Sequence, residues 1–143
     1  FVPPDDMRRA LRVAALRGLD VRLLLPAETN HISTTYAARA CYDEMLTAGV
    51  RLFLRRPPFM HSKFLLVDGR NAMVGTANFD NRSLKLNYET NLIVFDTAFA
   101  DAFKRRVLDD FAHADELDLA AWKRRPATQR LVENLFNLAS PAL

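Results

Sequence analysis

Hydrophobic positions in the first third of the chain follow helical and strand-like spacings in turn, and this order predicts an α/β fold. Apolar residues recur three and four positions apart over residues 5–17, which predicts an amphipathic helix that two leading aspartates cap and Gly18 ends. Mostly apolar runs at 21–25 and 50–54 predict short strands, and residues 34–47 between them are expected to be helical. Such alternation of helix and strand is typical of an α/β domain.

A hairpin is predicted in the middle of the chain, after a pair of prolines. Asp68 and Gly69 stand between two apolar runs, and Asp-Gly at this place favours a tight turn that pairs strand 62–67 with strand 72–75. A polar connection over 78–86 and a further strand over 89–95 follow. Helices are expected after that strand, over 96–113, 119–125 and 128–138.

Length and composition indicate one domain with a sizeable core. The chain has 143 residues, half of them hydrophobic, and no internal repeat or second domain can be recognised. The lone cysteine, Cys41, excludes an internal disulfide and is expected to be buried. A formal charge of +3 suits phosphate-bearing partners, although a solvated basic surface gives the same value.

The sequence has no apolar run as long as a membrane span, so the chain by itself is expected to be soluble. Its first residues, Phe1 and Val2, precede two prolines and have the pattern of the end of a strand. We therefore expect the chain to be a piece of a longer protein.

Candidate chemistry lies at the start and the end of the predicted hairpin. His61 and Lys63 are two residues apart in an extended segment and therefore share a face. Thr76 and Asn78 follow the second strand and can offer a hydroxyl and an amide. A lone histidine is usually structural, but a lysine on the same face of an apolar strand is costly without an anionic partner. Together these groups indicate a site for a tetrahedral phosphate.

The spacing of these residues resembles a known motif. His61-x-Lys63, Asp68 after four further residues and Gly75-Thr76-x-Asn78 after six more match every named position of the HKD motif of the phospholipase D superfamily. Residues 87–91, Asn-Tyr-Glu-Thr-Asn, are similar to the segment in which that family places an acid against its histidine. The resemblance implies an α/β phospholipase D-like lobe in which helices flank a mixed β-sheet.

The resemblance also implies roles for these residues. His61 would be the nucleophile that forms a phosphohistidine, or its acid/base partner, and Glu89 would orient the imidazole. Lys63 and Asn78 would hold the phosphate. Asp68 and Gly75 would support the structure of the motif. Three further residues are candidates for substrate binding, namely Thr76, Arg82 and His31. No cofactor and no metal are expected, because the family is metal-independent and no cluster of histidines and carboxylates has metal-ligand spacing.

Further segments are similar to the C-terminal half of bacterial cardiolipin synthases. They include residues 1–5, 14–26, 46–51, 58–61 and 78–84. This resemblance implies phosphatidyl transfer between phospholipids through a phosphohistidine, with phosphatidylglycerol as a substrate. It also implies association of the full-length protein with the cytoplasmic side of a membrane. Arg55 and Arg56 are expected to give the entrance beside His61 a basic rim.

The chain has one motif, whereas the family's mechanism needs two histidines. Residues 1–143 are therefore expected to be a single phospholipase D-like domain, the C-terminal half of a two-motif chain, or else one subunit of a homodimer. The isolated chain is expected to be inactive as a monomer. Two alternatives stay open: a homodimeric single-motif phosphodiesterase, nuclease or phospholipase D hydrolase, and a catalytically silent binding half. Nucleic acid is the less expected partner.

Overall fold

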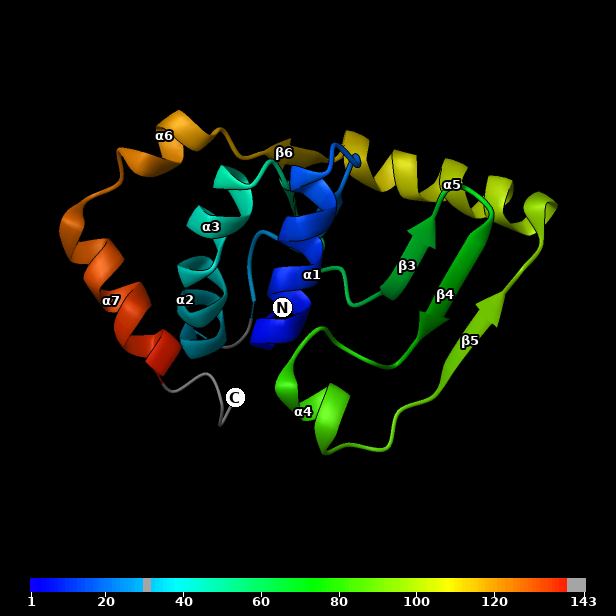
Figure 1. Ribbon diagram of the computed structural model, residues 1–143, viewed down its shortest axis with the longest axis horizontal. Coiled ribbons are helices and arrows are strands. Elements are labelled where there is room, and N and C mark those ends of the chain that lie inside the picture. The colour runs from blue at the N-terminus through cyan, green and yellow to red at the C-terminus, as the bar shows by residue number, and fades with distance from the viewer. Residues whose placement is uncertain (30–31, 139–143) are drawn as a thin grey trace.

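Two three-stranded sheets form the framework of the chain in the computed structural model, which describes residues 1–29 and 32–138 (Figure 1). The first sheet contains β1 (Arg22–Pro26), β2 (Arg51–Arg55) and β6 (Ala114–Glu116), in the order β1-β2-β6. Strands β1 and β2 are parallel, and β6 is antiparallel to β2. The predicted α/β class with flanking helices is confirmed, with the strands divided between two small sheets.

The second sheet is an antiparallel meander that contains the predicted hairpin. Its strands are β3 (Lys63–Val67), β4 (Asn71–Gly75) and β5 (Asn91–Val94), in chain order. The turn between β3 and β4 has left-handed backbone at Asp68 (φ 54°) and Gly69 (φ 62°). Positive φ at both central residues is the pattern of a type I′ turn, which matches the twist of the strands it joins. The Arg70 amide closes the turn by donating to the Val67 carbonyl at 3.1 Å.

Seven helices lie in the described part of the chain. They are α1 (Asp5–Leu16), α2 (Ile32–Ala40), α3 (Tyr42–Thr47), α4 (Asn81–Lys85), α5 (Thr97–Ala112), α6 (Leu119–Lys123) and α7 (Ala127–Leu138). The single helix predicted over 34–47 is wrong, because the chain makes a tight turn at Cys41, whose amide donates to the Ala38 carbonyl at 3.2 Å. Cys41 is buried as predicted, and burial raises the pKa of its thiol to about 12.

Two local features differ from the prediction for physical reasons. The residue that precedes α1 is Pro4, which has no side-chain group to cap the helix, so Asp5 and Asp6 lie inside the first turn instead. Their charges still favour the positive end of the helix dipole. Strand β6 was not predicted because it is short and acidic; Glu116 pairs with Arg51 (2.7 Å) rather than following an apolar alternation.

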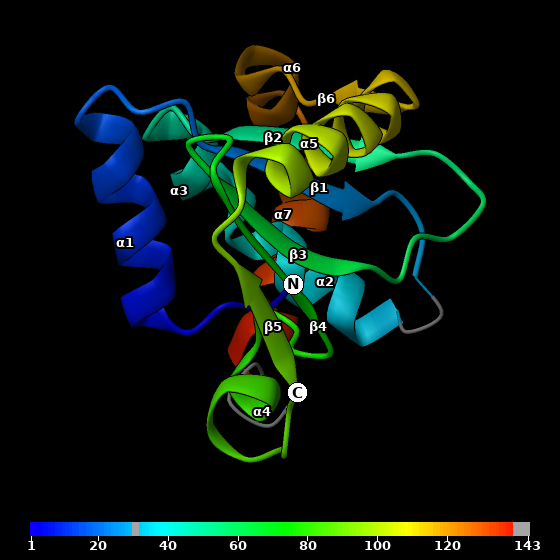
Figure 2. The same ribbon diagram turned by 90° about the vertical axis from the view of Figure 1, so that its right-hand side faces the viewer.

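Helix α5 holds the two sheets together. Phe111 packs edge-on against Phe53 of β2 with 4.7 Å between ring centroids, and Phe103 packs against Phe64 of β3 at 5.5 Å. The helix runs along the top of both sheets in Figure 1 and lies above them in the turned view of Figure 2. Edge-to-face contacts at these distances are favourable for aromatic rings. The first sheet is therefore tied to the second one through α5.

A buried carboxylate attaches the last helix to the body. Glu133 of α7 is fully buried, and its two oxygens lie 3.0 Å from Arg39 Nε of α2 and 2.9 Å from Arg125 Nε. Both guanidinium groups also lie over the ring of Trp122, at 5.2 and 4.1 Å from its centroid. Trp122 is buried in the core. The network therefore connects α2, α6 and α7 around one tryptophan.

Candidate active site

Asp68 of the HKD motif lies in the turn at one end of the second sheet, whereas the opposite end holds the first and last parts of the motif. Strand β3 begins there, β4 ends there and β5 begins there, because the three strands form an antiparallel meander (Figure 1). In the register of the sheet, Lys63 pairs with Gly75, which in turn pairs with Asn91. Cross-strand partners share a face of the sheet, so the motif lysine and glycine meet although eleven residues separate them in the sequence.

Gly75 is needed because β4 and β5 approach each other closely at this point. A Cβ atom at residue 75 would lie 2.8 Å from Asn91 Cα and even closer to the Thr90 carbonyl oxygen. Backbone atoms cannot move aside as a flexible side chain can. The close approach also lets the Thr76 amide donate to the Thr90 carbonyl at 3.1 Å. A structural role for Gly75 agrees with this geometry.

Hydroxyl and amide donors surround the Glu89 carboxylate. Thr76 Oγ1 donates to Oε2, and Asn87 Nδ2 donates to Oε1 at 3.4 Å. The Thr90 amide donates to the Thr76 hydroxyl at 3.0 Å, which fixes the direction of that hydroxyl. Hydrogen bonds to the Glu89 carboxylate lower its pKa. The bond from Thr76 has the largest effect, and a bond from Ser83 has the next largest. The side chain is therefore held as a carboxylate.

Replacing Thr76 by valine should raise the pKa of Glu89 towards that of an ordinary glutamate. Valine keeps the shape of the side chain but removes the hydroxyl that contributes most to the lowered pKa. An NMR titration of the Glu89 carboxyl carbon measures the change. Because the folded-state pKa is lowered, the bonds to Glu89 stabilise the fold at neutral pH and lose this effect as the pH falls through that pKa. Thr76→Ser is the control and should keep the low pKa; an unchanged pKa in Thr76→Val would contradict this assignment.

Lys63 is half-buried at the first position of β3, near the carboxylates of Glu89 and Asp80. Its Nζ donates to the His61 carbonyl at 2.9 Å. Partial burial lowers the pKa of Lys63, and the nearby carboxylates of Glu89 and Asp80 oppose this effect by favouring the ammonium form. A cation in this position can neutralise the nonbridging oxygens of a phosphate.

Three further predicted site residues belong to segments that adjoin this end of the second sheet, and their side chains are exposed: His61, Asn78 and Arg82. His61 precedes β3, and its ring centroid lies 5.8 Å from that of Phe59. Asn78 follows β4, and Arg82 lies in α4; both are exposed. His31 lies outside the described residues. Asp68 lies in the turn at the far end of β3, away from this group. This position agrees with the structural role expected of it.

The expected pairing of Glu89 with the His61 imidazole stays a prediction. In the described part of the chain, the hydrogen-bond partners of the Glu89 carboxylate are Thr76, Ser83 and Asn87. Ser83 was missed in the sequence, although one signal marks its place: Asp80 stands three residues earlier and caps α4 by accepting from the Ser83 amide at 2.7 Å. The cap turns this segment so that Ser83 is buried beside Glu89.

Acidic side chains lie next to Arg55 and Arg56, the two arginines expected to form a basic rim. Arg55 Nε lies 3.4 Å from Asp110 of α5, and Arg56 forms an ion pair with Asp115 of β6. Both arginines therefore have carboxylate partners on neighbouring elements. The expectation of a basic rim beside His61 stays a prediction.

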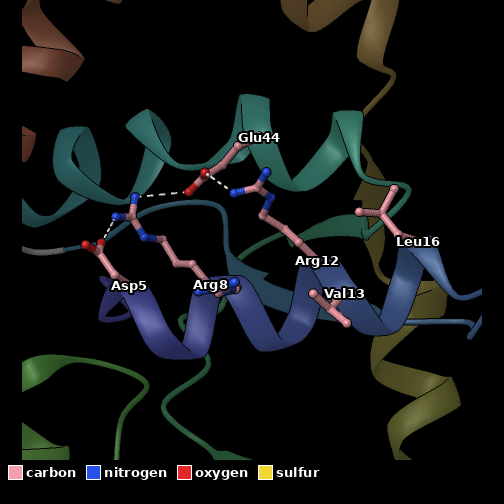
Figure 3. A pocket seen from close by; sticks show the side chains of 7 residues that line it. Asp5, Arg8, Arg12, Val13, Leu16 and Glu44 are labelled. Carbon is pink, nitrogen blue, oxygen red and sulfur yellow. Dashed lines mark hydrogen bonds and ion pairs between the residues drawn. The ribbon is translucent and has the colours of Figure 1, made fainter.

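A separate hollow lies between α1 and α3, away from the motif. It is lined mainly by charged residues, and Glu44 of α3 accepts from Arg8 (3.0 Å) and Arg12 (2.9 Å) of α1 (Figure 3). Both arginines already have carboxylate partners, and no residue of the HKD motif lines the hollow. We interpret it as the contact that attaches α1 to the body.

The groups at the end of the second sheet are of the kinds that phosphoryl chemistry uses. The half-buried Lys63 ammonium and the Glu89 carboxylate lie at this end, and the exposed side chains of His61 and Asn78 belong to the segments that adjoin it. An imidazole can attack phosphorus, while fixed donors and a cation stabilise the charge that develops on the phosphoryl oxygens.

Relatives of known name match the whole chain. Cardiolipin synthase of Geobacillus thermodenitrificans is 42% identical over 143 residues, all of this chain and 28% of that protein. Cardiolipin synthase 2 of Bacillus anthracis is 39% identical with the same coverage. Cardiolipin synthase A of Salmonella arizonae is 42% identical over all of this chain and 29% of that protein. The chain thus spans less than a third of the length of these relatives.

Solved structures and family patterns agree with this similarity. Nuc, a phospholipase D family member from Salmonella typhimurium, superposes with a TM-score of 0.70 over 80% of this chain and 75% of its own, at 22% identity, which supports the fold. The pattern described as "Cardiolipin synthase, PLD-like domain" matches residues 1–111. The chain therefore belongs to the family of phospholipase D-like domains of cardiolipin synthase.

Proposed function

We propose that this chain supplies one HKD half of a phosphatidyltransferase of the cardiolipin synthase type. The observation that carries the proposal is the gathering of Lys63, Thr76 and Glu89 at the end of the sheet that His61 precedes. The relatives named cardiolipin synthase supply the type of reaction. His61, Lys63, Asn78 and Glu89 are the residues proposed to act on the phosphate.

The proposed reaction has two steps, and each transfers the phosphatidyl group once. In the first, a ring nitrogen of His61 attacks the phosphorus of a phospholipid, the bond to the leaving alcohol breaks, and an imidazolium of a second HKD half gives that alcohol its proton. In the second, the hydroxyl of another phospholipid, proposed to be phosphatidylglycerol, attacks the phosphohistidine. Its proton returns to the second imidazole, and His61 is released. Lys63 and Asn78 hold the phosphoryl oxygens, and Glu89 orients the imidazole.

The second histidine must come from outside residues 1–143, either from a sister half or from a second copy. We favour the sister half, with this chain as the C-terminal part, because relatives more than three times as long match the whole chain. Membrane association of the complete protein belongs to the same proposal. Within the described residues, no helix combines the length and the apolar character needed to cross a membrane.

The mass of the chain in solution, measured together with its activity, tests this proposal. Light scattering gives the mass across an eluted peak, and hydrolysis of a chromogenic phosphodiester is followed in the same fractions. We expect an inactive monomer. In the polypeptide that carries a second HKD half, we expect conversion of phosphatidylglycerol to cardiolipin, dependent on His61.

Two results would contradict the proposal. An active dimer that cleaves polynucleotides and transfers nothing to phosphatidylglycerol would favour the homodimeric phosphodiesterase or nuclease. Transfer that persists after His61→Ala in the two-motif polypeptide would instead indicate a catalytically silent half that only binds.

A further inference from the structure

A run of exposed apolar and basic side chains follows the site directly. We call residues 82–88, Arg-Ser-Leu-Lys-Leu-Asn-Tyr, the rim segment. Leu86 is 77% exposed and Tyr88 is fully exposed, and Leu84 is also exposed. The segment contains α4 except for its first residue, together with the loop that leads to Glu89, and α4 projects from the end of the second sheet in both views (Figures 1 and 2).

The charge of the rim segment is entirely positive. Arg82 and Lys85 are exposed, and no acidic residue lies between residues 82 and 88. Ion pairs found in the described part of the chain engage other basic side chains, such as Arg8, Arg12 and Arg125, and not these two. The acid that follows, Glu89, is occupied by Thr76 and Asn87. The segment therefore presents two cations to solvent together with its apolar side chains.

This combination fits an anionic lipid surface. Tyrosine rings lie at the level of lipid headgroups, leucine side chains insert into the boundary with the acyl chains, and lysine and arginine pair with anionic headgroups. We propose that the rim segment is the part of this chain that contacts an anionic phospholipid bilayer, with Leu86 and Tyr88 inserted. The inference rests on the proposed function, since it names the surface from which His61 would receive its substrate.

Charge favours the bilayer over a second copy of the chain as the occupant. A twofold contact through the rim segment would bring Arg82 and Lys85 of both copies together, and like charges at short distance repel. A bilayer rich in phosphatidylglycerol provides negative charge and an apolar interior at once. Its headgroups would then lie next to Glu89 and Lys63, which the sheet holds at the same end of the molecule.

Co-sedimentation of the chain with vesicles tests this inference without any catalytic readout. The chain should bind vesicles of phosphatidylglycerol and should not bind vesicles of phosphatidylcholine. The double variant Leu86→Ser/Tyr88→Ser should lose at least about tenfold in vesicle affinity, and Lys85→Gln should weaken the binding and its salt dependence. Leu16→Ser on α1, where Leu16 is 69% exposed, is the matched control and should bind as the wild type does. Circular dichroism establishes that each variant is folded.

Three outcomes would overturn the inference. They are absence of binding to phosphatidylglycerol vesicles, equal losses in Leu16→Ser and the double variant, and a change from dimer to monomer in the double variant, which would identify the segment as a contact between copies.

The proposed function fails separately. His61→Ala should bind vesicles normally, and transfer between short-chain phospholipids dissolved as monomers needs no surface. Transfer on such substrates without vesicle binding would leave the function standing and would reject the rim segment as a membrane contact.

Discussion

Replacing His61 by glutamine should reduce phosphoryl transfer by at least about 10³-fold in the two-motif polypeptide, because glutamine has no ring nitrogen to attack phosphorus. Its amide can still hydrogen-bond, so the change tests nucleophilicity rather than size or polarity. His61 is exposed ahead of β3, and exposed side chains of this kind change stability by less than about 0.5 kcal/mol. Steady-state transfer from phosphatidylglycerol, together with thermal unfolding, separates a chemical defect from a folding defect.

His113 provides a matched control for this experiment. It is also an exposed histidine, at the end of α5, where its Nδ1 lies 2.8 Å from the Asp109 carbonyl oxygen. His113→Gln should leave transfer unchanged. If His61→Gln and His113→Gln have the same activity, His61 is not the nucleophile, and the chain takes part in the reaction only by binding.

Replacing Glu133 by alanine should lower the free energy of unfolding by about 3–5 kcal/mol, because it leaves two guanidinium groups without their buried partner. Glu133 is fully buried, and its carboxylate lies between Arg39 and Arg125. Both guanidinium groups lie over the ring of Trp122, and Arg125 is only 10% exposed, so water can replace little of the lost carboxylate there. Equilibrium unfolding in urea, followed by tryptophan fluorescence, measures the loss.

Glu116→Ala is the control for the buried network. Glu116 also accepts from an arginine, Arg51 at 2.7 Å, but both side chains are more than 40% exposed. An exposed pair of this kind contributes at most about 1 kcal/mol. Losses of similar size in Glu116→Ala and Glu133→Ala would show that burial does not decide the strength of these pairs and would contradict the assignment.

Features encoded within a few neighbouring residues could be predicted from the sequence. The turn at Asp68 and Gly69 was predicted because only certain residues accept left-handed backbone, and the pairing of β3 with β4 followed from it. Helix α5 was predicted from its apolar spacing and from Asp96, which caps it by accepting from the Phe99 amide at 2.7 Å. The exact register, in which Lys63 lies opposite Gly75 and Val67 opposite Asn71, was not predicted.

Features that depend on distant contacts could not be predicted. The division into two sheets depends on which strand edges meet. The short strand β6 pairs with β2, and ion pairs join Arg51 to Glu116 and Arg56 to Asp115 beside this pairing. Side-chain direction was also hidden. The bond from the Thr76 hydroxyl to Glu89 was not predicted, and the expected contact of Thr76 with substrate stays a prediction. A spacing motif identifies the residue types of a site, whereas their hydrogen-bond partners come from the assembled fold.

The connectivity of the second sheet has a consequence for the order of folding. Strands β3 and β4 are joined by the turn at residues 68–70, so the loop that closes this pair is short and costs little entropy, whereas residues 76–90 with helix α4 lie between β4 and β5. The parallel pairing of β1 with β2 must instead close a loop that contains two helices. Local pairings form faster than distant ones. The hairpin of β3 and β4, which places Lys63 opposite Gly75, can therefore form early, before the sheet that carries most of the core is complete.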